Sequence, residues 1–108
     1  MTDPVIDFGA EKITAEMFRA QLDSECRVVL QGGEVSLRLV EVTDPVTAAG
    51  FERFSLAFHG PPEALLPDGV HTFHHESLGW FAIFIVPVFE SNAERIVYEA
   101  SFNRRSSR

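Results

Sequence analysis

One stretch of the sequence constrains the fold more than any other: residues 79–88, which read Gly-Trp-Phe-Ala-Ile-Phe-Ile-Val-Pro-Val. Successive side chains of an extended strand point to opposite sides, so both faces of this strand would be apolar. A strand with one solvated face alternates apolar and polar residues instead. We therefore expect one face to meet the domain core and the other to be covered by a helix or a partner chain. The core face would hold Phe81, Ile83, Ile85 and Pro87, and the second face Ala82, Phe84, Val86 and Val88.

Length and charge limit the class of protein. A chain of 108 residues suffices for one domain with one core, and its 45% hydrophobic residues and ten Phe exclude a disordered chain. The net charge is −7, and residues 1–103 alone hold six basic and sixteen acidic residues. So acidic a surface repels phosphate groups, and we expect no nucleic-acid partner and no docking on anionic membranes. We expect one small β domain over residues 1–103 and a basic, disordered tail over residues 104–108.

The expected compartment follows from what the sequence lacks. Cys26 is the only cysteine, so no disulfide can form within the chain, and the start Met-Thr-Asp-Pro contains no basic and apolar signal segment. The longest apolar stretch, residues 80–89, is about half as long as a membrane-spanning helix and contains Pro87. We therefore expect a cytoplasmic protein without a membrane span.

One short helix is expected near the N-terminus. Thr14 is suited to cap a helix from Ala15 to about Leu22. Its apolar side would hold Ile13, Met17, Phe18 and Leu22. A helix of about two turns is not stable alone, so it should dock on the domain. We expect it to cover part of the second face of residues 80–88, and the loop at residues 65–66 or another subunit to cover the rest.

From Cys26 onward the apolar residues recur with a period of two, which is typical of strands. Gly32-Gly33 predicts a two-residue hairpin turn, and the blurred pattern over residues 39–42 predicts a bulge or a bend. The expected strands are residues 26–31, 34–43, 51–59, 70–75, 80–88 and 94–103, with loops at 44–50 and 60–69. This pattern predicts a mainly β fold of about six antiparallel strands, curled into a small barrel or sandwich, plus the one N-terminal helix.

Several segments carry a family resemblance. Residues 66–79 contain Leu-Pro-Asp-Gly and His-His-Glu-Ser-Leu-Gly, residues 81–88 are Phe-rich and end in Val-Pro-Val, and residues 98–104 read Tyr-Glu-Ala-Ser-Phe-Asn-Arg. Together with residues 39–42 and 54–61, they resemble a family of short bacterial proteins classed as a domain of unknown function. His71 stands where that family usually has Tyr, so no role of the hydroxyl is carried over. The resemblance implies a small β domain without an established activity. Members are sometimes encoded beside phage-tail-like collar or fibre proteins, which implies an accessory role in a particle or surface assembly.

The cluster that most resembles a metal site is formed by His71, His74, His75 and Glu76. On a strand, His71 and His75 share one face while His74 points the opposite way, so three ligands cannot converge on one ion without a bulge. His59 could complete a pair only if its strand were a neighbour. We expect the four histidines to be surface or turn-capping residues; a transition-metal site and acid–base catalysis are the alternatives.

The remaining polar and reactive side chains have structural readings. Cys26 opens an apolar strand and is expected to be buried, with use as a nucleophile as the alternative. Glu99 and Asn103 share a polar face opposite Tyr98, and a catalytic carboxylate would need a second acid that the sequence does not identify. Trp80 either binds a partner or packs over the barrel end. We expect no catalytic, cofactor-binding or metal-binding residue.

The expected function is that of a non-catalytic interaction or structural subunit of a larger bacterial assembly, of phage-tail-like type. The expected occupant of its surface is a protein partner or a second copy of the chain. The alternatives are a barrel that binds a small apolar ligand and an enzyme that depends on these histidines or on a metal. The expected interaction surface consists of Trp80, Ala82, Phe84, Val86 and Val88.

Overall fold

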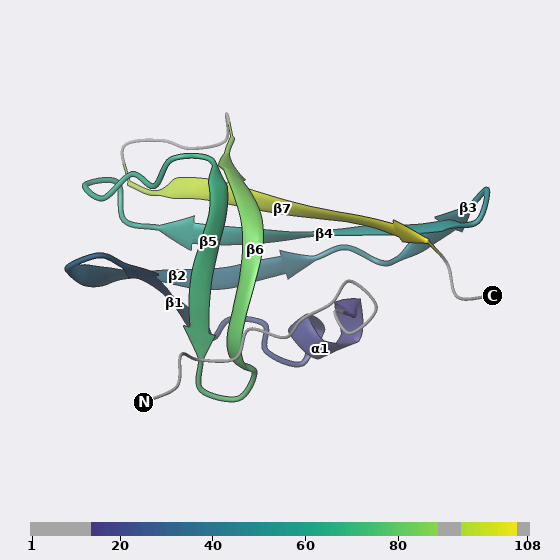
Figure 1. Ribbon diagram of the computed structural model, residues 1–108, viewed down its shortest axis with the longest axis horizontal. Helices are drawn as coiled ribbons and strands as arrows, with labels where there is room; N and C mark the ends of the chain where they lie inside the picture. The colour runs from purple at the N-terminus through teal and green to yellow at the C-terminus, as the bar shows by residue number, and fades with distance from the viewer. Residues whose placement is uncertain (1–13, 89–93, 106–108) are drawn as a thin grey trace.

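The computed structural model of the protein describes residues 14–88 and 94–105, which contain one helix and seven strands (Figure 1). In chain order these are α1 (Ala15–Arg19), β1 (Glu25–Leu30), β2 (Gly33–Val42), β3 (Val46–Ala48), β4 (Phe51–Gly60), β5 (Gly69–His75), β6 (Gly79–Pro87) and β7 (Ile96–Arg105). Over the described ranges, no helix has the length and apolar character needed to cross a membrane.

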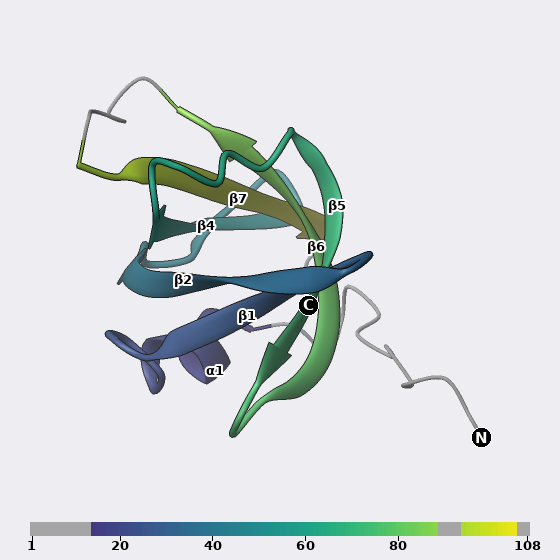
Figure 2. The same cartoon turned by 90° about the vertical axis from the view of Figure 1, so that its left-hand side faces the viewer.

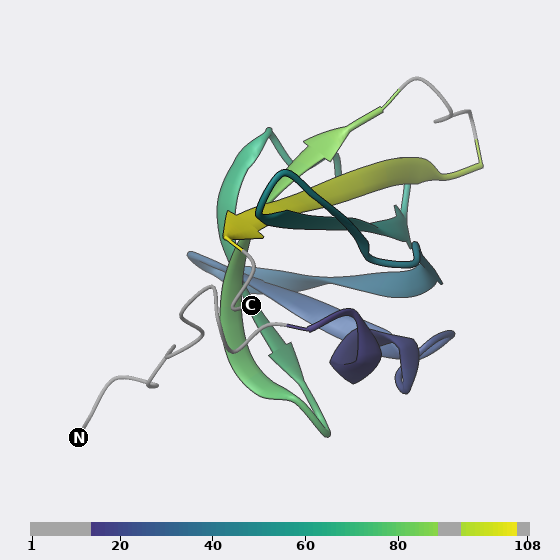
Figure 3. The same ribbon diagram turned by 90° about the vertical axis from the view of Figure 1, so that its right-hand side faces the viewer.

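All the strands belong to one antiparallel sheet with the order β2-β1-β5-β6-β7-β4-β3. A further pairing between β2 and β4 joins the two sides of this sheet, so six strands close into a barrel and β3 extends β4 outside it. Figures 2 and 3 show the strands curving around a common interior, and in Figure 1 β5 and β6 cross β2, β4 and β7 steeply. The expected mainly β fold is confirmed, and of the two expected architectures the barrel is the one that forms.

β2 is the strand that makes closure of the barrel possible. It pairs with β1 through Arg38 and with β4 from Arg38 onward. Just after this change of partner, the register of the β2–β4 pairing shifts between Leu39 and Glu41. A bulge of this kind bends a strand and increases its twist, so β2 can turn from one neighbour to the next. The irregularity expected over residues 39–42 is therefore confirmed, and it bends β2 where the strand pairs with β4.

The first hairpin is confirmed with a shift of one residue. Its last pair is Leu30↔Gly33, so the turn consists of Gln31 and Gly32, and the expectation of a Gly32-Gly33 turn is wrong. Gly32 takes a left-handed φ of 91°, which costs glycine little because it has no Cβ. One such residue is sufficient for this turn, and Gly33 becomes the first residue of β2.

Two boundaries differ from those expected. Residues 44–50, expected as a loop, contain β3, because Ala49 and Gly50 take left-handed φ angles of 55° and 83° and turn the chain directly into β4. Alanine rarely adopts this conformation, so the turn was not recognisable from the sequence. At the other end, β7 continues through Arg105, two residues into the expected tail, while residues 106–108 lie outside the described ranges.

Side chains from the strands fill the barrel interior. Phe73 stacks on Phe81, with ring centroids 5.1 Å apart, and contacts Phe58 at 5.5 Å. Tyr98 is fully buried, and its hydroxyl accepts a hydrogen bond from the Leu66 N–H at 2.9 Å. This bond anchors the connection between β4 and β5, and Leu66 is buried as part of the core. The other buried apolar side chains of the strands are Cys26, Val28, Leu37, Leu39, Phe54, Leu56, Ile83, Ile85 and Ala100.

Helix α1 completes the core where β6 and β7 diverge. These strands share two residue pairs near the end of β6 and separate beyond them. Phe18 is fully buried in this region, edge-on to Phe81 at 5.4 Å and stacked with Phe102 at 6.5 Å between ring centroids. In both side views α1 lies at the lower end of the barrel (Figures 2 and 3). The docking of the helix is therefore confirmed.

The length of α1 differs from the expectation. Thr14 caps the helix as expected, since its hydroxyl accepts from the Met17 N–H at 3.1 Å. The helix ends at Arg19 rather than near Leu22 because the Asp23 N–H bonds to β2 and draws the chain toward β1. Leu22 consequently stays 39% exposed, contrary to its expected place on the apolar side, and Ile13 lies outside the described residues.

Candidate interaction surface

The second apolar face of β6 lies on the outside of the barrel. Phe84 is 53% exposed and Val86 38% exposed, whereas Ala82 is half-buried. Val70 lies directly opposite Phe84 on β5 and is 68% exposed. Directly opposite side chains in an antiparallel pair lie about 5 Å apart, so these two form one apolar area. We call the outward residues Val70, Trp80, Ala82, Phe84 and Val86 the β5–β6 patch.

The expectation that α1 covers part of this face is wrong. Phe18 packs on Phe81, which is on the core face of β6, because the short helix is needed to complete the core between β6 and β7. The loop expected as the alternative cover does not reach the patch either: Leu66 is buried beside Tyr98 in the core, and Leu65 is 63% exposed. The sequence did not identify Val70 as part of the patch, because its position opposite Phe84 depends on the strand register.

One border of the patch is a row of aromatic and polar side chains. Trp80 lies opposite His74, and their ring centroids are 4.7 Å apart. The Arg27 guanidinium donates to Nδ1 of His74 at 3.1 Å and lies 3.5 Å from the Glu34 carboxylate. Trp80 therefore packs on the outer surface of the sheet and not over the barrel end. Val88 is half-buried, and its N–H donates to the Val97 carbonyl at 2.9 Å, so it extends the β6–β7 pairing.

His75 caps the turn that follows β5. Its Nδ1 accepts hydrogen bonds from the N–H groups of Ser77 (2.9 Å) and Leu78 (3.1 Å). The proton of the neutral ring is then on Nε2, which donates to Ser24 Oγ at 2.7 Å, and that hydroxyl donates to the Gln21 carbonyl. Burial lowers the pKa of His75, although Glu76 opposes this shift. The ring is therefore held neutral as a structural group.

The other histidines do not converge with His75. His71 donates through Nε2 to the Pro67 carbonyl at 2.8 Å, and His74 is on the outer face. His59 lies on β4, whose partners are β2, β3 and β7, so it is not next to the histidines of β5. Over residues 14–88 and 94–105, no group of three His, Cys, Asp or Glu side chains could hold a metal ion.

The other candidate side chains are explained by burial. Cys26 is fully buried, and burial raises the pKa of its thiol to about 12. A thiol with this pKa stays protonated at neutral pH and is not a nucleophile. Burial also raises the pKa of Tyr98, against a smaller opposing effect of its bond from Leu66. Glu99 and Asn103 are both exposed, so they share the outer face of β7 as expected.

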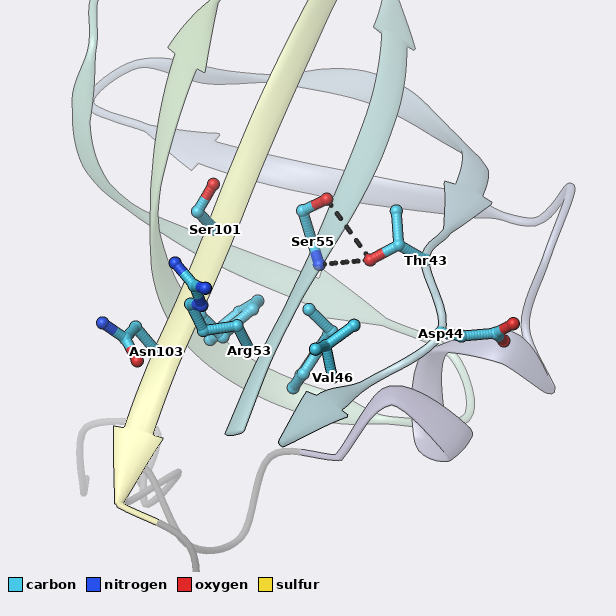
Figure 4. A pocket seen from close by; sticks show the side chains of 9 residues that line it. Thr43, Asp44, Val46, Arg53, Ser55, Ser101 and Asn103 are labelled. Carbon is cyan, nitrogen blue, oxygen red and sulfur yellow. Dashed lines mark hydrogen bonds between the residues drawn. The ribbon is translucent and has the colours of Figure 1, made fainter. Parts of the chain in front are cut away.

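A hollow of about 470 Å³ opens between the end of β2, β3, β4 and β7 (Figure 4). The Thr43 hydroxyl accepts from the Ser55 N–H at 2.8 Å and thereby joins β4 to the chain after β2. Arg53 and Asn103 are cross-strand partners, and Figure 4 shows their side chains close together. The hollow is also lined by Asp44, Val46, Phe54, Ser101 and Phe102.

A second hollow, of about 350 Å³, lies between the middle of β2, the end of β4 and the start of β7. Three nitrogen-bearing side chains, Arg38, His59 and Arg95, line it together with one carboxylate, that of Glu25. Burial lowers the pKa of His59, and the charges of Arg95 and Arg38 lower it further. We call this region the basic hollow. Its other lining residues are Ser36, Leu37, Gly60 and Pro61.

Comparison with known proteins yields one match. A family model described as a domain of unknown function (DUF6916) matches residues 13–102. No curated protein and no solved structure matches the chain. The match includes α1 and extends into β7, so it covers the barrel and the helix that completes it. The resemblance seen in the sequence is thereby confirmed at the level of the family.

Proposed function

The chain belongs to the DUF6916 family, a domain of unknown function. We propose that it is a non-catalytic interaction subunit, which docks on a protein partner through the β5–β6 patch. The observation that carries the proposal is the exposure of Val70 (68%) and Phe84 (53%) side by side on the barrel exterior. Exposed apolar areas of this kind mark interaction surfaces.

The size of the patch favours a different protein over a second copy. Full burial of an apolar side chain contributes roughly 1.5–3 kcal/mol. Val70, Phe84 and Val86 are 68%, 53% and 38% exposed, so a partner that covered these exposed parts would gain about 3 kcal/mol in all. Association itself costs at least about 4 kcal/mol in lost freedom. Two copies, each with a net charge of −7, would also repel each other. The partner therefore has to supply further contacts beyond the patch.

A larger assembly supplies such contacts naturally. When a subunit is held at several points, each weak contact forms at a high effective concentration and small patches suffice. We propose a bacterial, phage-tail-like assembly, a choice that rests on the family resemblance. The buried Phe rings that occupy the barrel interior do not favour the alternative in which the barrel encloses a small apolar ligand.

The test is co-expression of the protein with the proteins encoded beside its gene. We expect a neighbour to co-purify at fixed stoichiometry, and Phe84→Glu to abolish this association while the variant stays folded. Phe51→Glu is the matched control, because Phe51 is 45% exposed but lies at the start of β4, away from the patch. Equal binding by wild type and Phe84→Glu would reject the proposal, as would a stable dimer of the purified wild type in light scattering.

A further inference from the structure

The basic hollow is a second feature of the surface, independent of the β5–β6 patch. Arg38 and His59 are cross-strand partners between β2 and β4, so their side chains leave the sheet next to each other. Gly60 pairs with Ile96, the residue after Arg95, which brings the Arg95 side chain to the same end of β4. Three segments far apart in the sequence thus place their basic groups around one hollow of about 350 Å³.

From this arrangement we propose that the basic hollow binds a carboxylate group. Guanidinium groups present paired N–H donors that match the two oxygens of a carboxylate. Within the described part of the chain, no carboxylate lies within 4.0 Å of the Arg38 guanidinium, whereas Arg95 lies 3.8 Å from Glu94. Arg38 therefore has donors available for an incoming anion.

The acidic groups around the hollow select the class of anion. With His59 neutral, the positive charges of Arg38 and Arg95 stand beside two carboxylates: Glu25, the cross-strand partner of Arg38, and Glu94, which lies 3.8 Å from Arg95. A carboxylate brings one negative charge to this site, whereas a phosphate brings close to two at neutral pH and is repelled more strongly by Glu25 and Glu94. The occupant is accordingly a carboxylate, either on a small free acid or on an acidic side chain of a protein.

His59 makes the affinity depend on pH. His59 lines the same hollow as Arg38, Arg95 and Glu25, and the charges of the two arginines disfavour protonation of its ring. A bound carboxylate offsets their effect, so the bound state takes up a proton more readily than the free state. Binding should therefore strengthen as the pH falls toward 6.

The experiment is an NMR titration of the full chain with sodium acetate at constant ionic strength, followed by the backbone amides near Arg38, His59 and Arg95. We expect saturable chemical-shift changes confined to this region. The affinity for acetate that they report should be higher at about pH 6 than at about pH 7.5. The double variant Arg38→Gln/Arg95→Gln should bind acetate at least about tenfold more weakly, because it loses hydrogen bonds to a charged group. Arg53→Gln is the matched control, because it removes an equally exposed arginine from β4 outside this hollow.

Further arms separate the alternatives. His59→Gln should retain binding and lose the pH dependence. A peptide acetyl-Gly-Glu-Gly-amide that binds more tightly than acetate identifies a protein side chain as the occupant, and equal affinities identify a free acid. Unsaturable shifts, unchanged affinity in the double variant, or tighter binding of inorganic phosphate than of acetate would each overturn the proposal.

Discussion

Replacement of His75 by alanine should strongly destabilise the barrel. The ring is 3% exposed and makes three hydrogen bonds: it accepts from the backbone N–H groups of Ser77 and Leu78 and donates to Ser24 Oγ. At about 1 kcal/mol net for each bond, the loss amounts to about 3 kcal/mol. Domains of this size are stable by only about 5–15 kcal/mol, so the melting temperature should fall by roughly 10 °C or more.

The same residue should make stability depend on pH. Burial is the main cause that lowers the pKa of His75 in the folded state, with Glu76 opposing and His74 and Arg27 adding to the effect. The unfolded chain, with a pKa of about 6.5, then binds the proton more readily than the folded one. The free energy of unfolding therefore falls as the pH drops below about 6.5 toward the folded-state pKa.

The assay is thermal and urea unfolding, followed by circular dichroism, of wild type and His75→Ala at about pH 7.5 and about pH 5.5. The variant should lose less stability than wild type between these two pH values, because it lacks His75. Some loss should remain in both proteins, because both keep His59, whose pKa is also lowered. His71→Ala is the control, since its half-exposed ring makes one hydrogen bond, to the Pro67 carbonyl, and the loss of this bond should cost under about 1 kcal/mol. A cost below about 1 kcal/mol for His75→Ala, or equal pH dependence in both proteins, would refute the assigned role.

Two further substitutions test the packing. Phe18→Ala removes the fully buried ring that packs on Phe81 between β6 and β7, and it should lower the free energy of unfolding by about 3–5 kcal/mol in urea melts; a loss under about 1 kcal/mol would mean that α1 does not complete the core. Gly60→Ala would place its Cβ 2.5 Å from Cδ2 of buried Leu37 and should cost about 1–3 kcal/mol. Gly33→Ala, with nothing within 4 Å of its Cβ, should leave the melting temperature almost unchanged, and equal effects of the two glycine substitutions would contradict the close packing at Gly60.

Features that depend on neighbours along the chain could be predicted from the amino-acid sequence. The period-two pattern, the Thr14 cap, the turn near Gly32 and the irregularity between Leu39 and Glu41 all follow from backbone preferences and from alternation within a strand. For the same reason, the two apolar faces of β6 were evident before the fold was known. The turn at Ala49-Gly50 could not be predicted from the sequence, because its first residue adopts a left-handed conformation that alanine rarely takes.

The neighbours of each strand, in contrast, depend on how the whole chain folds. Whether six strands close, which face α1 covers, and that Val70 stands beside Phe84 depend on registers between segments distant in sequence. The basic hollow also depends on such registers, since its three nitrogen-bearing side chains come from β2, β4 and the residue that precedes β7. Pairing between distant strands is fixed by the shared core and by closure of the barrel, and neither is encoded in the local pattern of any single strand.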